Sequence, residues 1–137
     1  PRTTTMSGSS DTRSSASGLP KLQWPTSCWT SAGPSDAPIR PVLDAYLGRH
    51  GMVLDDFDGF ICHPGGAKVI AALERVFQVS DGNLGHARGV LRDYGNMSAA
   101  TVMFVLDRVM AEGKSGRYLM SALGPGFSVG FLTLKIP

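Results

Sequence analysis

The stretch Gly59-Phe60-Ile61-Cys62-His63-Pro64-Gly65-Gly66 determines how the rest of this chain is interpreted. Its apolar residues 59–62 predict a short strand that is buried on both faces. His63 follows at the end of that strand, and Pro64-Gly65-Gly66 predicts a turn that opens into a helix. Such a turn can present an imidazole in a pocket, since glycines let the backbone approach a ligand and helix N-termini favour anions. The alternative is a packed histidine followed by an ordinary turn.

Apolar periodicity predicts helices on both sides of this strand. Upstream, Pro41 suits a first helical turn, and the apolar stripe after it ends near Gly48 or Gly51. Downstream, one helix runs from the turn to Ser80-Asp81-Gly82-Asn83, and a second covers about 84–94. The apolar residues behind these predictions are Val42, Leu43, Tyr46, Leu47, Val69, Ile70, Leu73, Val76, Phe77, Val90, Leu91 and Tyr94.

The next segment predicts a helix that is capped by Asn96 or Ser98 and runs to Gly113. It is apolar nearly all round, which predicts a central buried helix.

Two strands are predicted to finish the chain, from Tyr118 to Leu123 and from Phe127 to Lys135, joined by Gly124-Pro125-Gly126. Alternating strands and helices followed by an antiparallel pair predict an α/β layered fold with a mixed sheet.

Composition excludes several classes of function. With 137 residues, 42% of them hydrophobic and 18% charged, the chain has room for one ordinary domain. A net charge of +2 without a basic stripe predicts no nucleic-acid partner, and the short apolar runs predict no membrane span. The start lacks an apolar signal core, so the expected location is the cytoplasm. Cys28 and Cys62 have no metal-ligand spacing, and no metal is expected.

Residues 1–41 differ in composition from residues 42–137, which are predicted to form the globular domain. Ser, Thr, Pro and Gly dominate the first segment, and its hydrophobic residues follow no period. Such a composition predicts an irregular tail or linker, because it buries too little apolar surface to offset the entropy of ordering.

Asn96 is the second candidate for chemistry, beside His63. It follows a glycine and precedes the apolar helix, so its side chain could cap that helix. It could also donate a hydrogen bond to a developing oxyanion, and both roles require the same place at a helix start. Cys62 is not expected to be a nucleophile beside His63, because adjacent strand residues point to opposite faces of a sheet.

Taken together, these motifs resemble the C-terminal domain of the chalcone synthase-like, type III polyketide synthases, and the resemblance is closest to bacterial members. The matching segments are His63-Pro64-Gly65-Gly66, Leu91-Arg92-Asp93-Tyr94-Gly95-Asn96-Met97-Ser98-Ala99-Ala100 and Gly124-Pro125-Gly126-Phe127, within a match from about Val42 to Leu134. The resemblance implies a thiolase-like half-domain, in which a mixed sheet carries helices on both faces.

The resemblance also implies a chemistry: a Cys-His-Asn site accepts a starter acyl group from coenzyme A and extends it with malonyl units. His63 and Asn96 would donate hydrogen bonds to the malonyl thioester carbonyl as carbon dioxide leaves. Gly65 and Gly66 would line the pantetheine passage, and Ser98 with the loop Gly124, Pro125 and Gly126 would shape the product cavity. The implied partners are malonyl-CoA, an acyl-CoA starter and a second copy of the full-length enzyme, and no cofactor is implied.

Two features depart from the family pattern. The family's nucleophilic cysteine lies in an N-terminal half that this sequence does not contain. Residues 1 to about 40 also match no part of the family, and we hypothesise that they are a frameshifted translation of the normal region.

Two alternatives follow from the same residues. A β-ketoacyl carrier protein synthase that starts fatty acid chains has the same fold and triad, and it fits residues 95–100 nearly as well. A non-catalytic half-domain would instead expose the face that the missing half covers, and it would aggregate or dimerise.

Overall fold

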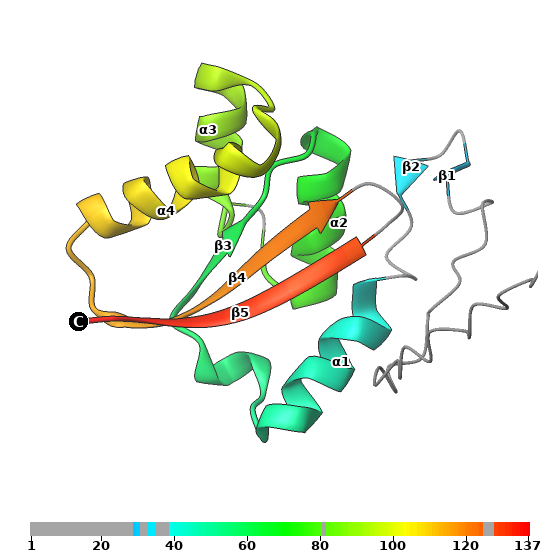
Figure 1. The fold of residues 1–137 in the computed structure, drawn as a ribbon, viewed down its shortest axis with the longest axis vertical. Coiled ribbons are helices and arrows are strands. Elements are labelled where there is room, and N and C mark those ends of the chain that lie inside the picture. Colours follow the sequence, from blue (N-terminus) through cyan, green and yellow to red (C-terminus); the bar gives the residue numbers. More distant parts are fainter. Residues whose placement is uncertain (1–28, 31–32, 35–38, 81, 125–127) are drawn as a thin grey trace, which may run out of the picture.

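The computed structural model describes residues 29–30, 33–34, 39–80, 82–124 and 128–137, and its central element is a three-stranded sheet. The strand order is β3 (Gly59–Cys62), β4 (Gly116–Gly124) and β5 (Ser128–Ile136). β3 runs parallel to β4, and β5 runs antiparallel to β4 (Figure 1). The predicted mixed sheet is therefore confirmed.

Four α-helices surround the sheet: α1 (Ile39–His50), α2 (Ala67–Phe77), α3 (Gly85–Tyr94) and α4 (Thr101–Ala111). Two short 3-10 helices, η2 (Leu54–Asp56) and η3 (Ser98–Ala100), precede β3 and α4. A parallel strand pair needs a long crossover, and here the crossover contains α2, α3 and α4.

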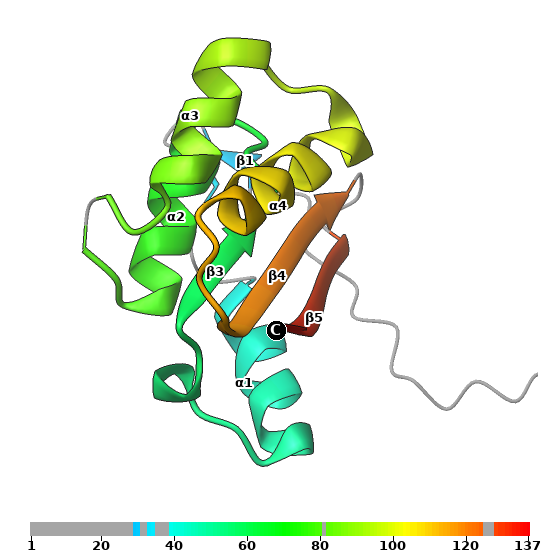
Figure 2. The same cartoon turned by 90° about the vertical axis from the view of Figure 1, so that its left-hand side faces the viewer.

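Helices cover both faces of the sheet, as expected of a layered α/β fold (Figure 2). On one face, Phe60 of β3 stacks on Phe77 of α2 with 4.7 Å between ring centroids. On the same face, Tyr46 of α1 shares a hydrogen bond of 2.8 Å with Thr133 of β5. α4 packs on the other face, where the Tyr118 hydroxyl of β4 donates to the carbonyl of Lys114 beyond the end of α4.

The first helix begins at Ile39, earlier than the domain boundary expected at residue 42. Ile39 is only 2% exposed, and Arg40 donates hydrogen bonds to the Asp44 carboxylate and the Val76 carbonyl. These contacts extend the helix back across Pro41, which stands in its first turn, where no backbone donor is lost.

Part of the segment expected to be irregular contains regular structure. Trp29–Thr30 (β1) and Gly33–Pro34 (β2) pair as two short antiparallel strands. The expectations for residues 1–28, 31–32 and 35–38 lie outside the described residues.

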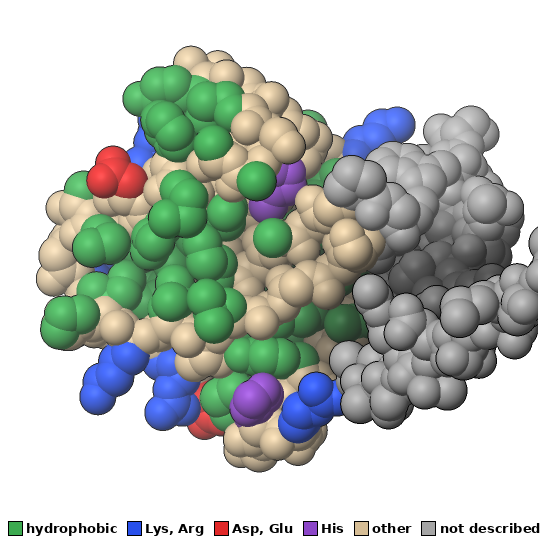
Figure 3. Space-filling model, in the orientation of Figure 1, with side chains coloured by type: hydrophobic (Ala, Val, Ile, Leu, Met, Phe, Trp, Pro, Cys, Tyr) green, Lys and Arg blue, Asp and Glu red, His purple; other side chains and the backbone are tan. Residues whose placement is uncertain are grey.

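α4 differs most from its prediction as a helix buried all round. Thr101, Val102, Val105 and Val109 are buried, whereas Met103 is 55% and Met110 is 56% exposed. Phe104 on α4 and Leu132 on β5 are also exposed, and Figure 3 shows hydrophobic side chains gathered over α4 and the neighbouring strands. We call Met103, Phe104, Met110 and Leu132 the α4 apolar face; each of these side chains is 40–56% exposed.

Candidate active site

His63 directly follows β3 and is only 7% exposed. Its backbone N–H donates to the carbonyl of Ser121 at 2.9 Å, which continues the β3–β4 pairing by one residue. Burial lowers the pKa of the imidazole below its ordinary value. This shift favours the neutral imidazole, which has one ring N–H to donate and one nitrogen to accept.

The turn after His63 folds back onto the imidazole. The N–H of Gly65 donates to the His63 carbonyl at 3.0 Å, and Gly66 precedes the first residue of α2. A Cβ placed on Gly65 would lie 3.7 Å from His63 Nε2, an ordinary contact, and one on Gly66 would meet open space. The ring thus lies against Gly65, while the surface beside Gly66 is free.

Asn96 links this turn to the start of α4, across 31 positions of sequence. Its Nδ2 donates to the Gly65 carbonyl at 3.1 Å, and its Oδ1 accepts from the Ser98 backbone N–H at 2.9 Å. The second bond forms an Asx turn. The first bond uses one of the two Nδ2 hydrogens, so the other hydrogen is available to a ligand.

The cap predicted for α4 is wrong in its detail. α4 starts at Thr101 without a side-chain cap, because η3 stands between Asn96 and the helix. Ser98, the other predicted cap, is exposed and has a left-handed backbone with φ of 60°. That conformation is uncommon for a residue with a side chain.

Thr101 organises residues 95–100, the connector between α3 and α4. No sequence pattern singles it out, because a threonine early in an apolar helix is ordinary. Its hydroxyl is fully buried, accepts from the Met97 N–H at 2.8 Å and donates to the Ser98 carbonyl at 2.8 Å.

Cys62 is excluded as the nucleophile, as its place on the strand predicts. It lies on the Phe60 face of the sheet, one residue out of phase with His63, and its side chain is fully buried. Burial raises the pKa of its thiol to about 12, partly opposed by the Ser121 hydroxyl. A thiol with that pKa carries almost no nucleophilic thiolate at neutral pH.

The structure therefore brings His63, Gly65, Gly66, Asn96 and Ser98 together at one end of the sheet. Gly124 closes β4 at the same end, because β3 and β4 are parallel there. Pro125 and Gly126, which were expected to line the same cavity, lie outside the described residues.

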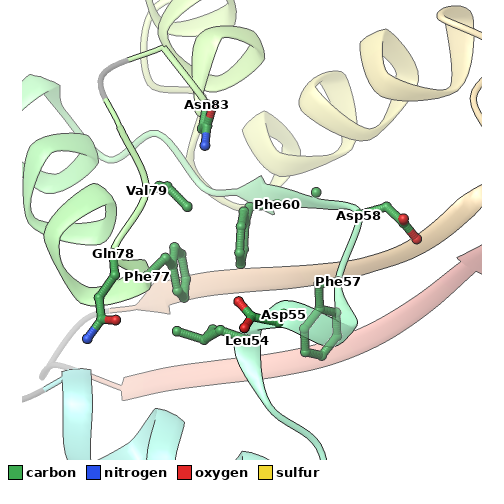
Figure 4. A pocket seen from close by; sticks show the side chains of 10 residues that line it. Leu54, Asp55, Phe57, Asp58, Phe60, Phe77, Gln78, Val79 and Asn83 are labelled. Atoms are coloured by element: carbon green, nitrogen blue, oxygen red, sulfur yellow. The ribbon is translucent and has the colours of Figure 1, made fainter.

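A cavity of about 460 Å³ lies at the opposite end of β3 (Figure 4). Leu54, Phe60, Phe77 and Asn83 are among the residues that line it, and it shares none with the predicted site. Among the described residues, no three His, Cys, Asp or Glu side chains are grouped to hold a metal ion. No helix in the described part of the chain is long and apolar enough to cross a membrane.

Residues 39–135 match the family model described as "Chalcone and stilbene synthases, C-terminal domain". The chain belongs to the chalcone and stilbene synthase family. The match begins at the first residue of α1 and ends within β5, so it contains every residue of the site described above. The resemblance seen in the sequence is confirmed.

Bacterial relatives agree with this assignment. The chain is 39% identical over 96 residues to a 1,3,6,8-tetrahydroxynaphthalene synthase of Streptomyces peucetius subsp. caesius, covering 68% of this chain and 26% of that protein. It is 38% identical over 93 residues to a putative chalcone synthase of Bacillus subtilis, covering 66% and 26%. The chain thus spans about a quarter of the length of these chalcone and stilbene synthase relatives.

A solved structure shows the same fold. The crystal structure of PKS-I from the brown alga Ectocarpus siliculosus superposes with a TM-score of 0.63 at 28% identity, covering 74% of this chain and 29% of that one. The family match and the bacterial relatives place this chain among the type III polyketide synthases. The layered mixed sheet of this chain is the thiolase-like arrangement that was expected.

Proposed function

We propose that this chain is the C-terminal part of a type III polyketide synthase that condenses malonyl-CoA, with loss of carbon dioxide, onto a coenzyme A-linked starter. The observation that carries the proposal is the meeting of two side chains at Gly65. The His63 imidazole lies against Gly65, and the Asn96 amide donates to its carbonyl at 3.1 Å.

In this proposal, both side chains act as donors to the malonyl thioester carbonyl. When the bond to the carboxylate breaks, its electron pair moves into the thioester, and negative charge develops on the carbonyl oxygen. The neutral imidazole and the second amide hydrogen of Asn96 would stabilise that charge. Both donors are held before the substrate arrives, so little reorganisation is needed during the reaction.

The nucleophile comes from outside the residues described. The buried Cys62 thiol does not serve, so a cysteine in the remainder of the full-length enzyme would carry the growing chain. His63 would pair with that cysteine and favour its thiolate. Gly65 and Gly66 would line the path of the pantetheine arm, and Ser98 with Gly124, Pro125 and Gly126 would shape the product cavity.

Malonyl-CoA decarboxylation tests the two donors directly. The reaction consumes a proton and yields acetyl-CoA and carbon dioxide, which can be followed by chromatography. His63→Gln and Asn96→Ala should each lower the rate by about a hundred- to a thousand-fold. The matched controls are His50→Gln on α1 and Asn83→Ala beside the opposite cavity, which should leave the rate unchanged.

The exposed α4 apolar face favours a second candidate, a half-domain without catalysis of its own. The same assay separates the two, because a chain that never forms acetyl-CoA, alone or mixed with the N-terminal part of a bacterial relative, supports the non-catalytic role. Faster turnover with malonyl attached to a carrier protein than with malonyl-CoA would point instead to a β-ketoacyl carrier protein synthase.

A further inference from the structure

The connector between α3 and α4, residues 95–100, carries Asn96 but has little to hold it in place. Asn96 and Ser98 are exposed, so burial contributes little to their order. Gly95 has a positive φ of 73°, and Ser98 has one of 60°, which is unfavourable for a residue with a side chain. The conformation of the connector therefore needs specific bonds.

The Thr101 hydroxyl supplies such bonds from inside the protein. It is fully buried at the first position of α4, and it accepts the Met97 N–H and donates its single hydrogen to the Ser98 carbonyl, both at 2.8 Å. The Asn96 Oδ1 is a more distant neighbour of the same hydroxyl, at 3.5 Å. One buried hydroxyl thus bonds the two peptide units that stand on either side of the Met97–Ser98 peptide.

The Met97–Ser98 peptide between them determines where the Asn96 amide lies. Ser98 donates its backbone N–H to Asn96 Oδ1 at 2.9 Å, so displacing Ser98 displaces the amide. The other end of that amide reaches the Gly65 carbonyl at 3.1 Å. We infer that Thr101 is the positioning residue for Asn96: its hydroxyl holds the amide against the His63–Gly66 turn through Met97 and Ser98. The catalytic meaning of this inference rests on the proposed function, but the geometry does not.

Three variants of the full 137-residue chain separate the hydroxyl from the rest of the side chain. Thr101→Val keeps the shape and removes the hydroxyl, and Thr101→Ser keeps the hydroxyl and removes a methyl group. Ser121→Ala is the matched control, because it also removes one buried hydroxyl, on the face of the sheet that carries Cys62, away from the connector.

The readout is amide hydrogen exchange and the side-chain amide signals of asparagine, both measured by NMR. Thr101→Val should speed exchange at the Met97 and Ser98 N–H groups by roughly tenfold, the order expected for one lost hydrogen bond, and should shift the Asn96 side-chain signals. Thr101→Ser and Ser121→Ala should leave these signals close to those of the wild type.

Several results would overturn the inference. Unprotected exchange of the Met97 amide in the wild type would do so without any variant, as would an unchanged Asn96 signal in Thr101→Val. An equal effect of Ser121→Ala would reveal general loosening instead of positioning. Should Thr101→Val fail to fold, the wild-type Met97 exchange and the Thr101→Ser spectrum decide the question.

Activity gives a second, independent readout. If the wild type decarboxylates malonyl-CoA, Thr101→Val should lower kcat with little change in KM, and Thr101→Ser should restore it. A wild-type chain that shows no decarboxylation, alone or mixed with the N-terminal part of a bacterial relative, contradicts the proposed function and leaves the exchange result to judge Thr101 alone.

Discussion

Arg108 of α4 donates a hydrogen bond of 2.7 Å to Asp93 at the end of α3, so one ion pair ties together the two helices that flank Asn96. The same guanidinium lies 5.6 Å from the centroid of the Tyr94 ring, a cation–π distance. Gly89 makes room for it, because a Cβ there would stand 2.5 Å from the Arg108 Nη1.

Arg108→Met should lower the melting temperature more than Arg92→Met does. Both arginines bind Asp93, but Arg92 is its neighbour on the same helix and is far more exposed, so only Arg108 joins two elements. Thermal unfolding followed by circular dichroism measures the difference. Equal shifts for the two variants would show that the link between the helices adds nothing.

The contribution of Asp93 should disappear in acid. Hydrogen bonds from Arg92 and Arg108 lower the pKa of its carboxyl to about 2, so the folded chain holds this proton less tightly than the unfolded chain. The stabilisation is therefore fully present above about pH 4 and is lost as the pH falls toward 2. Melting temperatures of wild type and Asp93→Asn should differ at pH 7 and converge near pH 2. A constant difference over that range would contradict the assignment.

Cys62 should make the fold less stable in base. Its thiol has a pKa of about 12 when folded, against the ordinary 9.0, so above pH 9 the unfolded chain releases a proton that the folded chain keeps. Stability should then fall by up to about 1.4 kcal/mol per pH unit between pH 9 and 12. Denaturant unfolding of wild type and Cys62→Ala over this range isolates the effect. Parallel pH profiles for the two would refute it.

The α4 apolar face should make the isolated chain self-associate. Met103→Lys combined with Met110→Lys places charges on that face without touching the buried residues of α4, so the fold should persist while association weakens. Sedimentation velocity measures the association, with Ser80→Lys, on a different exposed segment, as the control. Equal association of the wild type, the double variant and Ser80→Lys would show that another surface causes the self-association.

Local sequence signals were sufficient for most elements. The strand at residues 59–62 and the α3 stop at Gly95 follow the prediction, because apolar runs and glycines act over a few residues. α2 ends at Phe77, earlier than the polar run at 80–83 suggested, since Gln78 adopts the left-handed conformation usually left to glycine.

Contacts between distant segments escaped prediction. The hydrogen bond from Asn96 to Gly65 joins segments 31 positions apart and depends on how α4 docks onto the sheet, which no local pattern encodes. The exposure of Met103 and Met110 was also not predicted, because an apolar helix face was taken to be buried within this chain. Apolarity predicts that a surface needs a partner, but it does not predict that the partner is in the same chain.

The parallel pairing of β3 with β4 has a consequence for the order of folding. Gly59 pairs with Tyr118, so the sheet closes only after the whole crossover has been synthesised, and such distant pairings form slowly. His63, Asn96 and Thr101 all lie inside that crossover. The site is therefore among the last parts of the molecule to assemble, and a nascent chain that stops before β4 contains both proposed donors without the strand that holds His63 in place.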